Sequence, residues 1–368
     1  MWRHALVTPH FAILVVAWLA AILMMPLLIR LAHRIGAVDR PRDYKAHGGP
    51  VPFLGGIAVY AAFSLGILVS TRDWDLRAYD SFLQFALEGS PLKPLFGIVI
   101  GGAFVLLLGL LDDFRPINAM LKLMVLFLIA LLLHHFEIRV RLFPDRLEWL
   151  NIAVSLLWLA GVTSAMNSLD HMDGNCSGAA AICAIFTFLF SWDRQNPQPW
   201  LSYAALALLG ATLGFLQFNF KPARIFLGNS GAFLVGFLLA AMTILGAWGS
   251  REEPIKALLI PPLLLGVPLY DITLATLLRW KSGTVKNIYE AVVFCGRDHL
   301  SHRLVALGLS ERAAVVAQYA LGCLFGTVAL TSRYSLQVFL FGVACLLVFL
   351  VALGMVLDRA PMPREGTK

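Results

Sequence analysis

The sequence predicts an all-α, polytopic integral membrane protein. Of its 368 residues, 59% are hydrophobic and 14% are charged, whereas soluble domains are about half apolar and about a quarter charged. The apolar residues also form uninterrupted runs of about 18 residues or more, the length that a membrane-spanning helix needs. A soluble fold of this size would interleave its charges with shorter apolar segments. We therefore expect a helix bundle that forms one domain over residues 1–368.

Eleven apolar runs are candidate transmembrane helices. Their predicted limits are 8–31, 53–70, 94–112, 118–134, 149–168, 177–192, 200–218, 231–248, 255–279, 312–331 and 336–357. The last two runs are joined by a short connection and could alternatively form one re-entrant pair. The first run is too long for a signal peptide and lacks a small-residue cleavage pattern, so we expect it to be retained.

Lysines and arginines set the predicted orientation, because cytoplasmic loops carry an excess of them. With the N-terminus outside, most basic loop residues lie on the cytoplasmic side, and the 134–148 segment with its three arginines fits least well. The net charge of +7 then reflects topology and anionic lipid headgroups, so no nucleic acid is expected as a partner. The five cysteines have no paired spacing, which argues against disulfides or a zinc site.

Five polar segments all fall on the cytoplasmic side in this topology. They are 45–56, 112–122, 167–178, 219–231 and 279–303. Structural loops have no reason to sort in this way, so we expect a catalytic face that looks into the cytoplasm from the cell membrane.

Two adjacent carboxylates, Asp112 and Asp113, end the third run, and Lys122 lies in the next one. Carboxylates at the edge of hydrocarbon are costly and usually mark function or reach for water. A single aspartate here would be a solvated helix end. The adjacent pair, followed by a lysine, favours a functional role.

Asn167, Asp170 and Asp173 close the fifth run at a spacing of three, which would keep them on one helical face. Gly174 is then expected to stop the helix. Acids at a helix C-terminus oppose the helix dipole, and a bound cation would offset that cost. Oxygen ligands of this kind suit Mg²⁺, which keeps waters and substrate phosphates in its coordination shell.

The remaining segments carry amides and bases. Asn219 begins a polar stretch, and Asn229 or Ser230 is expected to cap the helix that follows, which would create an anion site. His299, His302 and Arg303 share one stripe, which suggests either a phosphate clamp or a helix on the membrane surface. Carboxylates, amides and basic side chains together are typical of a site for phosphoryl transfer, in which the protein positions the reacting groups and stabilises charge.

The motifs resemble, in order along nearly the whole chain, those of the polyprenyl-phosphate N-acetylhexosamine-1-phosphate transferases of glycosyltransferase family 4. The family pattern Lys-x-His-x-x-Pro-x-Pro-Arg-x-Gly-Gly corresponds to 45–56, with Phe53 in place of the arginine. The family's Asp-Asp pair and later lysine correspond to Asp112, Asp113 and Lys122, and its Phe-Asn-x-x-Pro-Ala corresponds to 218–223.

The resemblance implies an enzyme that transfers a sugar 1-phosphate from a UDP-N-acetylhexosamine to a polyprenyl phosphate and releases UMP. UDP-N-acetylglucosamine and undecaprenyl phosphate are the first expectations, and the product would start a cell-envelope glycan. Mg²⁺ is the implied cofactor, for which Mn²⁺ can substitute, and a homodimer is left open. Asp112 and Asp113 would be catalytic, with Asp112 activating or orienting the lipid phosphate.

Three positions depart from the family pattern. Asp170 stands where relatives commonly have Asn, Asn229 stands where they have Asp, and His299-Leu-Ser-His302 lacks the middle histidine of His-x-His-His. The number of carboxylates is kept while one changes place, so the resemblance implies a retained metal site. The residues implied to hold Mg²⁺ are Asp170, Asn229 and Asp173. Those implied to bind substrate are Lys45, His47, Lys122, Asn167, Asn219, His299, His302 and Arg303.

Three alternatives stay open at this point. The chain could transfer phospho-N-acetylmuramoyl-pentapeptide, although the altered histidine motif disfavours this. It could transport lipid-linked sugars, although polar groups at mid-membrane would then be expected. It could also be a catalytically silent paralogue that binds lipid, which Asn229 would explain.

Overall fold

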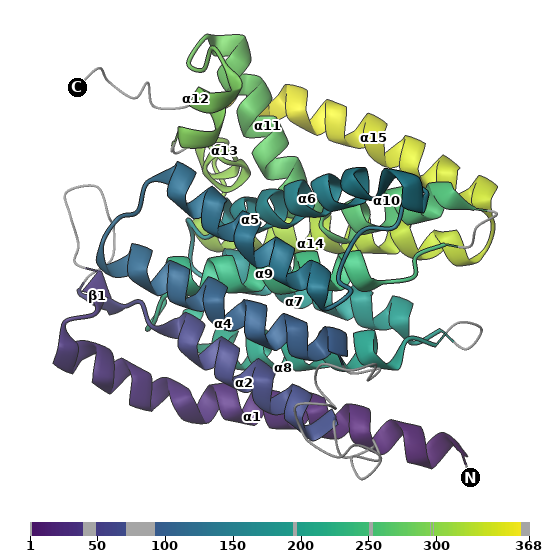
Figure 1. The fold of residues 1–368 in the computed structure, drawn as a ribbon. Helices are drawn as coiled ribbons and strands as arrows, with labels where there is room; N and C mark the ends of the chain where they lie inside the picture. The colour runs from purple at the N-terminus through teal and green to yellow at the C-terminus, as the bar shows by residue number, and fades with distance from the viewer. Residues whose placement is uncertain are drawn as a thin grey trace. The chain divides into compact units, whose positions relative to one another are not determined.

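The structure, a computed structural model, describes residues 2–39, 49–70, 93–193, 197–249, 253–294, 296 and 298–361. These residues are mostly helical (Figure 1). Strands β1 (Val38–Asp39) and β2 (Val51–Pro52) form one short antiparallel pair in which Val38 faces Pro52. The all-α prediction is therefore confirmed.

The helices group into two compact units, Met1–Ala247 and Trp248–Lys368. The single domain expected from the sequence stays a prediction. In the first unit the helices are α1 (Trp2–Ile35), α2 (Gly55–Ser70), α4 (Lys93–Phe114), α5 (Ala119–His135), α6 (Glu148–Leu169), α7 (Asn175–Ser191), α8 (Pro199–Asn219) and α9 (Gly228–Leu245). A 3₁₀ turn, η3 (Asp145–Leu147), precedes α6.

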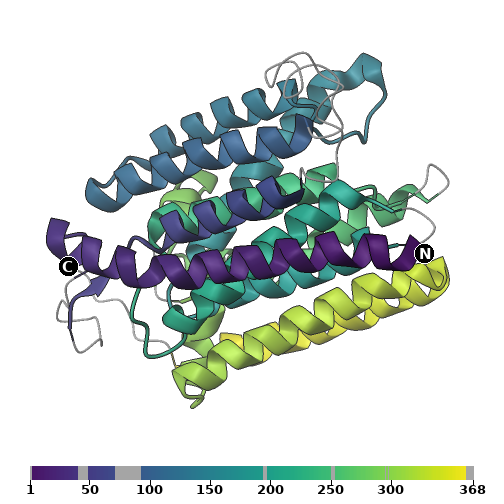
Figure 2. The same cartoon turned by 90° about the horizontal axis from the view of Figure 1, so that it is seen from below.

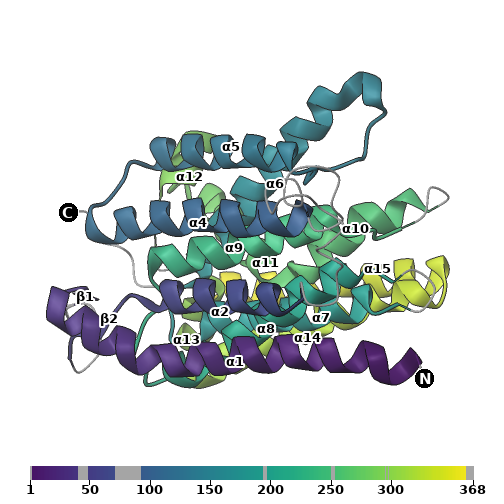
Figure 3. The ribbon, with the colours of Figure 1, turned by 60° about the horizontal axis from the view of Figure 1, so that its bottom comes forward.

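Helices α8 and α9 form the core of the first unit. Helix α8 packs against α1, α2 and α7, and α9 packs against α4 and α6. Figures 2 and 3 show α1 and α2 running side by side. Phe215 of α8 and Phe237 of α9 are fully buried. Close approach of α1 to α8 requires Gly210, since a Cβ there would lie 2.4 Å from the Leu14 carbonyl oxygen. Small residues of this kind let membrane helices pack tightly.

The second unit contains α10 (Pro254–Leu264), α11 (Gly266–Ser282), α12 (Ile288–Val293), α13 (Leu300–Ala306), α14 (Glu311–Leu330), the 3₁₀ turn η4 (Thr331–Arg333) and α15 (Leu336–Asp358). Helices α10 and α11 meet at a bend of 78°. Helix α14 packs against α10, α11, α13 and α15. The outer side of α15 is almost entirely exposed and apolar, as expected of a helix facing lipid.

Each predicted span overlaps a helix, and the run 255–279 overlaps the bent pair α10–α11. In the described part of the chain, seven helices are long and apolar enough to cross a membrane, and the bent pair would make an eighth. Three shorter apolar helices, α2, α5 and α7, account for the remaining predicted runs. The integral membrane character is thus confirmed, and the count of eleven spans stays a prediction. Since α14 and α15 each qualify alone, a re-entrant pair is not needed.

Candidate active site

Four polar segments meet at one end of the first unit. The Phe226 N–H donates to the Pro52 carbonyl at 2.7 Å, and the Gly56 N–H donates to the Leu227 carbonyl at 3.0 Å. The Ala223 N–H donates to Asp173 Oδ2 at 3.0 Å, which joins the α8–α9 connection to the α6–α7 turn. These four segments therefore lie together in the first unit, and the side of the membrane that they face stays a prediction. The fifth segment, 279–303, belongs to the second unit, and its side of the membrane stays a prediction.

Asp113 caps the N-terminus of α9 from a different helix. Its Oδ1 accepts the Asn229 N–H at 2.8 Å, and its Oδ2 accepts the Ser230 N–H at 3.1 Å. A carboxylate is stabilised at a helix N-terminus because unpaired N–H groups and the helix dipole favour negative charge there. Gly109 permits the approach, since a Cβ at that position would lie 2.3 Å from the Ser230 Cα.

The prediction that Asn229 or Ser230 caps this helix is therefore wrong. Helix α9 begins at Gly228, and Leu227 at the N-cap position makes no side-chain cap bond. Gly228 has φ +74°, and a Cβ there would lie 2.5 Å from the Phe53 carbonyl oxygen and 2.8 Å from Asp113 Oδ2. The cap comes from a residue distant in sequence, so local spacing could not reveal it.

Asp112 is buried and forms an ion pair with Lys122. Its Oδ2 lies 2.9 Å from Lys122 Nζ, and its Oδ1 accepts the Ile117 N–H at 2.8 Å. The ammonium group also lies 5.7 Å from the centre of the Phe233 ring. The lysine side chain is 24% exposed, against 5% for the aspartate, so Lys122 is the member of the pair that an incoming anion can reach.

The α6–α7 turn corrects two expectations. Helix α6 ends at Leu169, with Asp170 as its C-cap, so Asp170 and Asp173 do not continue the helical face of Asn167. Gly174, at φ +80°, is the N-cap position of α7 rather than the residue that stops α6. The carboxylates therefore lie in the turn between α6 and α7, and only Asp170, at the C-cap of α6, still opposes a helix dipole.

Asp170 is a carboxylate without a compensating partner. Among the described residues it accepts no hydrogen bond and forms no ion pair. Burial raises the pKa of its carboxyl to about 7, with further contributions from the negative charges of Asp113 and Asp173. These three carboxylates are thus close enough to repel one another, and a cation would relieve that repulsion.

The donor set fits Mg²⁺. Within the described ranges, no three His, Cys, Asp or Glu side chains form a ready metal cluster. Mg²⁺ does not need one, because it binds through one or two carboxylates and fills its shell with water and substrate phosphate. The carboxylate of Asp170 is the unpaired donor here. The side-chain amides of Asn167 and Asn229 also make no hydrogen bond within the described part of the chain.

Asn219 is buried and joins three segments. Its Oδ1 accepts the Gly174 N–H at 3.1 Å and the Ser177 hydroxyl at 2.9 Å, while its Nδ2 donates to the Ile225 carbonyl at 3.0 Å. The substrate-binding role expected of Asn219 would therefore be exerted through the fold of these segments. Lys45 and His47 lie outside the described residues.

In the second unit, two of the three expected phosphate ligands point inward. His299 is buried with its Nδ1 2.8 Å from Asp271 Oδ2. Arg303 donates to the backbone carbonyls of Asp298 at 2.7 Å and Leu357 at 3.1 Å. His302 is only partly buried. Sequence reasoning missed Asp271, although a carboxylate inside an apolar run is a functional signal in itself.

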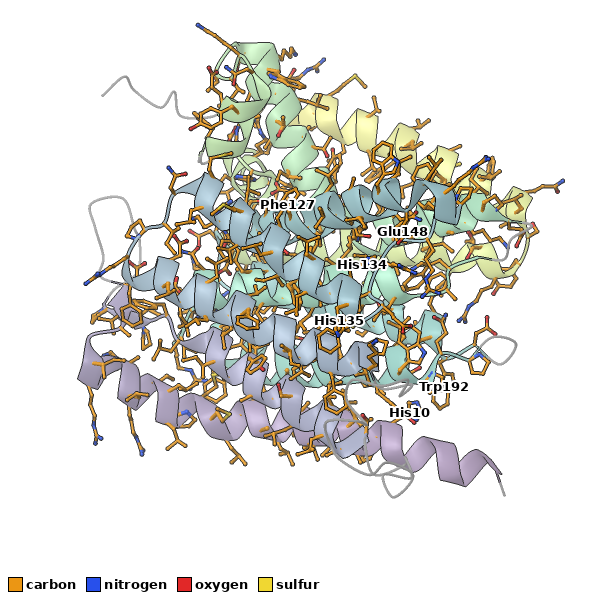
Figure 4. All side chains as sticks on the ribbon, in the orientation of Figure 1. His10, Phe127, His134, His135, Glu148 and Trp192 are labelled. Atoms are coloured by element: carbon orange, nitrogen blue, oxygen red, sulfur yellow. The ribbon has the colours of Figure 1, made fainter. Side chains whose placement is uncertain are left out.

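Away from this site, Figure 4 labels two further groups of side chains in the first unit, His134 with Glu148 and His10 with Trp192. Arg139 NH1 lies 2.8 Å from Glu148 Oε1 and 3.5 Å from His134 Nε2. The His10 ring is packed edge-on against Trp192, with ring centres 4.4 Å apart. Arg139 is thus paired with Glu148, which offsets part of the positive charge of the 134–148 segment.

Comparison with known proteins identifies a family and several similar proteins. The sequence profile of glycosyl transferase family 4 matches residues 95–247. A probable undecaprenyl-phosphate N-acetylglucosaminyl 1-phosphate transferase from Bacillus subtilis is 27% identical over 87% of this chain and 84% of that protein. A decaprenyl-phosphate N-acetylglucosaminephosphotransferase from Mycolicibacterium smegmatis is 30% identical over 78% of this chain and 73% of that protein.

A protein with the alternative activity is also similar. A phospho-N-acetylmuramoyl-pentapeptide-transferase from Bacillus velezensis is 25% identical over 86% of this chain and 95% of that protein. The profile match begins in α4 and ends with the first unit, so it includes every carboxylate of the cluster described above.

Proposed function

Because the chain belongs to the polyprenyl-phosphate N-acetylhexosamine-1-phosphate transferases of glycosyl transferase family 4, we propose that it transfers N-acetylglucosamine 1-phosphate from UDP-N-acetylglucosamine to a polyprenyl phosphate and releases UMP. The observation that carries the proposal is the gathering of carboxylates and Lys122 at one end of the first unit. Relatives named for this activity are similar over most of the chain.

The acceptor phosphate would meet Lys122. A phosphate monoester has its second pKa near about 6, so at neutral pH it is mostly dianionic and needs little help in losing a proton. Positioning and charge balance are then the main requirements. The buried Asp112 carboxylate holds the Lys122 ammonium at 2.9 Å, which fixes the direction in which that charge is presented. In this proposal Asp112 orients the lipid phosphate through Lys122.

Asp170 and the Asn229 amide, with Asp173, would hold Mg²⁺. When bound, the ion would neutralise charge on the donor pyrophosphate. The unpaired Asp170 carboxylate supports this assignment. Asp113 places the start of α9 beside the cluster, so Asn229 is brought near the carboxylates by the fold. The homodimer that the family resemblance leaves open stays a prediction.

The site would lie at the cytoplasmic face of the cell membrane, where it would meet UDP-sugars from the cytoplasm. Single cysteines placed at the exposed positions Arg115, Arg224 and Ser282 should react with an impermeant thiol reagent only from the cytoplasmic side. Cysteines at Arg141 and Tyr334 should react from outside. The background must lack the native cysteines, of which Cys323 and Cys345 are exposed. Reaction at 115 and 224 from the outer side would reverse the proposed orientation.

A donor panel tests the activity. Membranes containing the protein are incubated with polyprenyl phosphate, Mg²⁺ and one radiolabelled donor at a time, and labelled lipid is extracted and counted. UDP-N-acetylglucosamine should label the lipid fastest. Faster labelling with UDP-N-acetylmuramoyl-pentapeptide would favour the second candidate activity, which the similarity to a phospho-N-acetylmuramoyl-pentapeptide-transferase motivates. An absence of labelled lipid with all donors would reject both.

A further inference from the structure

An apolar cavity of about 320 Å³ lies within the second unit, between α13, α14 and α15. We propose that this cavity is a lipid site, which holds an acyl chain of a phospholipid from the surrounding bilayer. The proposal rests on the lining of the cavity and on the membrane-spanning character of α14 and α15. It does not depend on the proposed activity.

The cavity has a buried floor and an exposed rim. Leu300 of α13 and Leu321 of α14 line it and are buried. Leu324 of α14 and Phe349 of α15 also line it, and these side chains are 40% and 46% exposed. The cavity is therefore a groove that opens at the surface of the second unit, and we call it the α14–α15 groove.

The α14–α15 groove runs along the axis of α14. Ala317, Leu321 and Leu324 line it at spacings of four and three residues, so they lie on one face of the helix. From Ala317 to Leu324 the helix rises by about 10 Å. Spread over that length, the volume corresponds to a cross-section of roughly 30 Å². The groove therefore has the shape of an extended chain.

The groove lies at the depth of one leaflet of the bilayer. Helix α14 begins at Glu311 and α15 ends at Asp358, and charged residues at these ends favour the polar boundary of the membrane. The lining residues of α14, 317–324, lie about 9–20 Å from Glu311 along the helix, and Phe349 and Leu353 of α15 lie about 8–14 Å from Asp358. Half of the hydrocarbon core is about 15 Å thick, so the groove faces acyl chains.

The chemistry of the lining favours hydrocarbon over water. Its side chains are apolar except for Gln318, which is buried and whose Nε2 donates to the Ala314 carbonyl of the same helix at 3.4 Å. An enclosed water needs about two to four polar partners, and apolar cavities stay dry. Unfilled space also forfeits dispersion contacts. A hydrocarbon chain restores those contacts without burying a polar group.

The dimensions and the surroundings of the groove favour an acyl chain over other apolar occupants. A helix of a second copy, about 10 Å in diameter, is too wide for it. A polyprenyl chain carries methyl branches at regular intervals, whereas an acyl chain is narrow and unbranched along most of its length. The groove is also continuous with the exposed apolar face of α15, which meets the bilayer directly. Phospholipid acyl chains are therefore the occupants that reach it first.

Native mass spectrometry of the protein purified in a mild detergent tests the site. The wild type should retain a phospholipid. Ala317→Phe places a ring in the groove and should lower the retained fraction about tenfold, because overpacking a filled space is costly. Val316→Phe is the matched control, since Val316 is exposed on α14 and does not line the groove; it should retain lipid like the wild type. Equal retention in the wild type and in Ala317→Phe would overturn the proposal.

Photolabelling of the wild type decides the matter even if Ala317→Phe does not fold. A phospholipid with a diazirine on its acyl chain, added to the protein in detergent, should label the peptides that contain Leu324 and Phe349, and excess unlabelled phospholipid should prevent this. Labelling at Phe341, an exposed residue of α15 outside the groove, should not be competed. Labelling of the groove that is displaced by polyprenyl phosphate but not by phospholipid would assign the groove to the acceptor. Labelling that is lost when the chain dimerises would assign it to a second copy. Either result would overturn the proposal.

Thermal unfolding gives an independent measurement, because a ligand that binds only the folded state stabilises it. Adding phospholipid to delipidated protein should raise the unfolding temperature of the wild type and of Val316→Phe, and should leave that of Ala317→Phe unchanged. An equal rise in all three proteins would show that phospholipid stabilises the protein from outside the groove and would contradict the proposal.

Discussion

The Asp113 carboxylate accepts the backbone N–H of Asn229 at 2.8 Å, although 116 residues separate the two. The contact ties the end of α4 to the start of α9, and it brings a backbone dipole and a carboxylate cluster to the same place. One member of the Asp112–Asp113 pair thus builds the site, while the other pairs with Lys122. This division of roles leads to separate predictions for the two neighbours.

Asp113→Ala should lower the free energy of unfolding by about 1–2 kcal/mol, the usual cost of losing a helix N-cap. The free energy of unfolding of Asp113→Asn should lie between those of the wild type and Asp113→Ala, because an amide oxygen can still accept one N–H. Thermal unfolding of the purified proteins in one detergent measures both. Asp358→Asn, which removes an exposed ion pair with Lys281 in the second unit, is the control and should leave the stability unchanged. An Asp113→Ala protein as stable as the wild type would show that this cap contributes nothing.

Asp112→Asn should affect turnover more than folding. Without the negative charge that holds it, the Lys122 ammonium should lose its fixed direction, and kcat should fall about a hundredfold, the scale of losing one acid–base or positioning group. Binding of the UDP-sugar, measured by calorimetry, should stay nearly unchanged, as should expression. Wild-type turnover in this variant would remove Asp112 from the mechanism.

The exchange of Asn and Asp between positions 170 and 229 can be tested by reversing it. Mg²⁺ gains more from a carboxylate oxygen than from a neutral amide. Asp170→Asn should therefore abolish activity together with its metal dependence. Adding Asn229→Asp restores the common family arrangement, so the double mutant should recover much of the lost activity.

Initial rates of the four proteins across a Mg²⁺ titration decide the matter. The two changes should be strongly non-additive, as expected for groups that share one ion. The structure removes the competing explanation that Asn229 serves as a helix cap, since its side chain makes no cap bond. A double mutant no more active than Asp170→Asn would reject the exchange and favour a silent paralogue.

Thermal stability in the absence of divalent metal should fall as the pH rises. The pKa of the Asp170 carboxyl is about 7 in the folded protein and about 4 in an unfolded chain. The folded state therefore binds this proton more tightly. The resulting stabilisation is complete below about pH 4 and is lost as the pH rises through about 7.

The unfolding temperature in EDTA should accordingly be several degrees lower at about pH 8 than at about pH 5, and Asp170→Asn should remove most of that difference. Because Asp170 is only partly buried, solvent screening should make the effect smaller than for a fully buried carboxyl. An identical pH dependence in the wild type and in Asp170→Asn would mean that this carboxyl titrates normally.

Much of the fold was predictable, because run length and composition are read directly from the chain. The apolar runs around Phe63, Phe215 and Phe237 each became a helix. The carboxylates of the site were also predictable, because carboxylates near hydrocarbon are rare and costly and therefore stand out in the sequence.

Partnerships over long separations were not predictable from spacing. Asp113 caps α9, and the Asn219 side-chain oxygen accepts hydrogen bonds from Gly174 and Ser177. The phosphate-binding role expected of His299 stays a prediction, and spacing did not reveal that its Nδ1 lies 2.8 Å from Asp271 Oδ2. Tertiary contacts, which periodicity does not encode, decided each of these cases.

The most direct test of the central claim measures both products of the purified protein in nanodiscs. With UDP-N-acetylglucosamine and Mg²⁺, UMP should be released only when polyprenyl phosphate is present, and each UMP should be matched by one labelled lipid. Asp170→Asn serves as the inactive comparison. UMP release without the lipid acceptor, or a folded protein that forms no labelled lipid from any UDP-N-acetylhexosamine, would contradict the account.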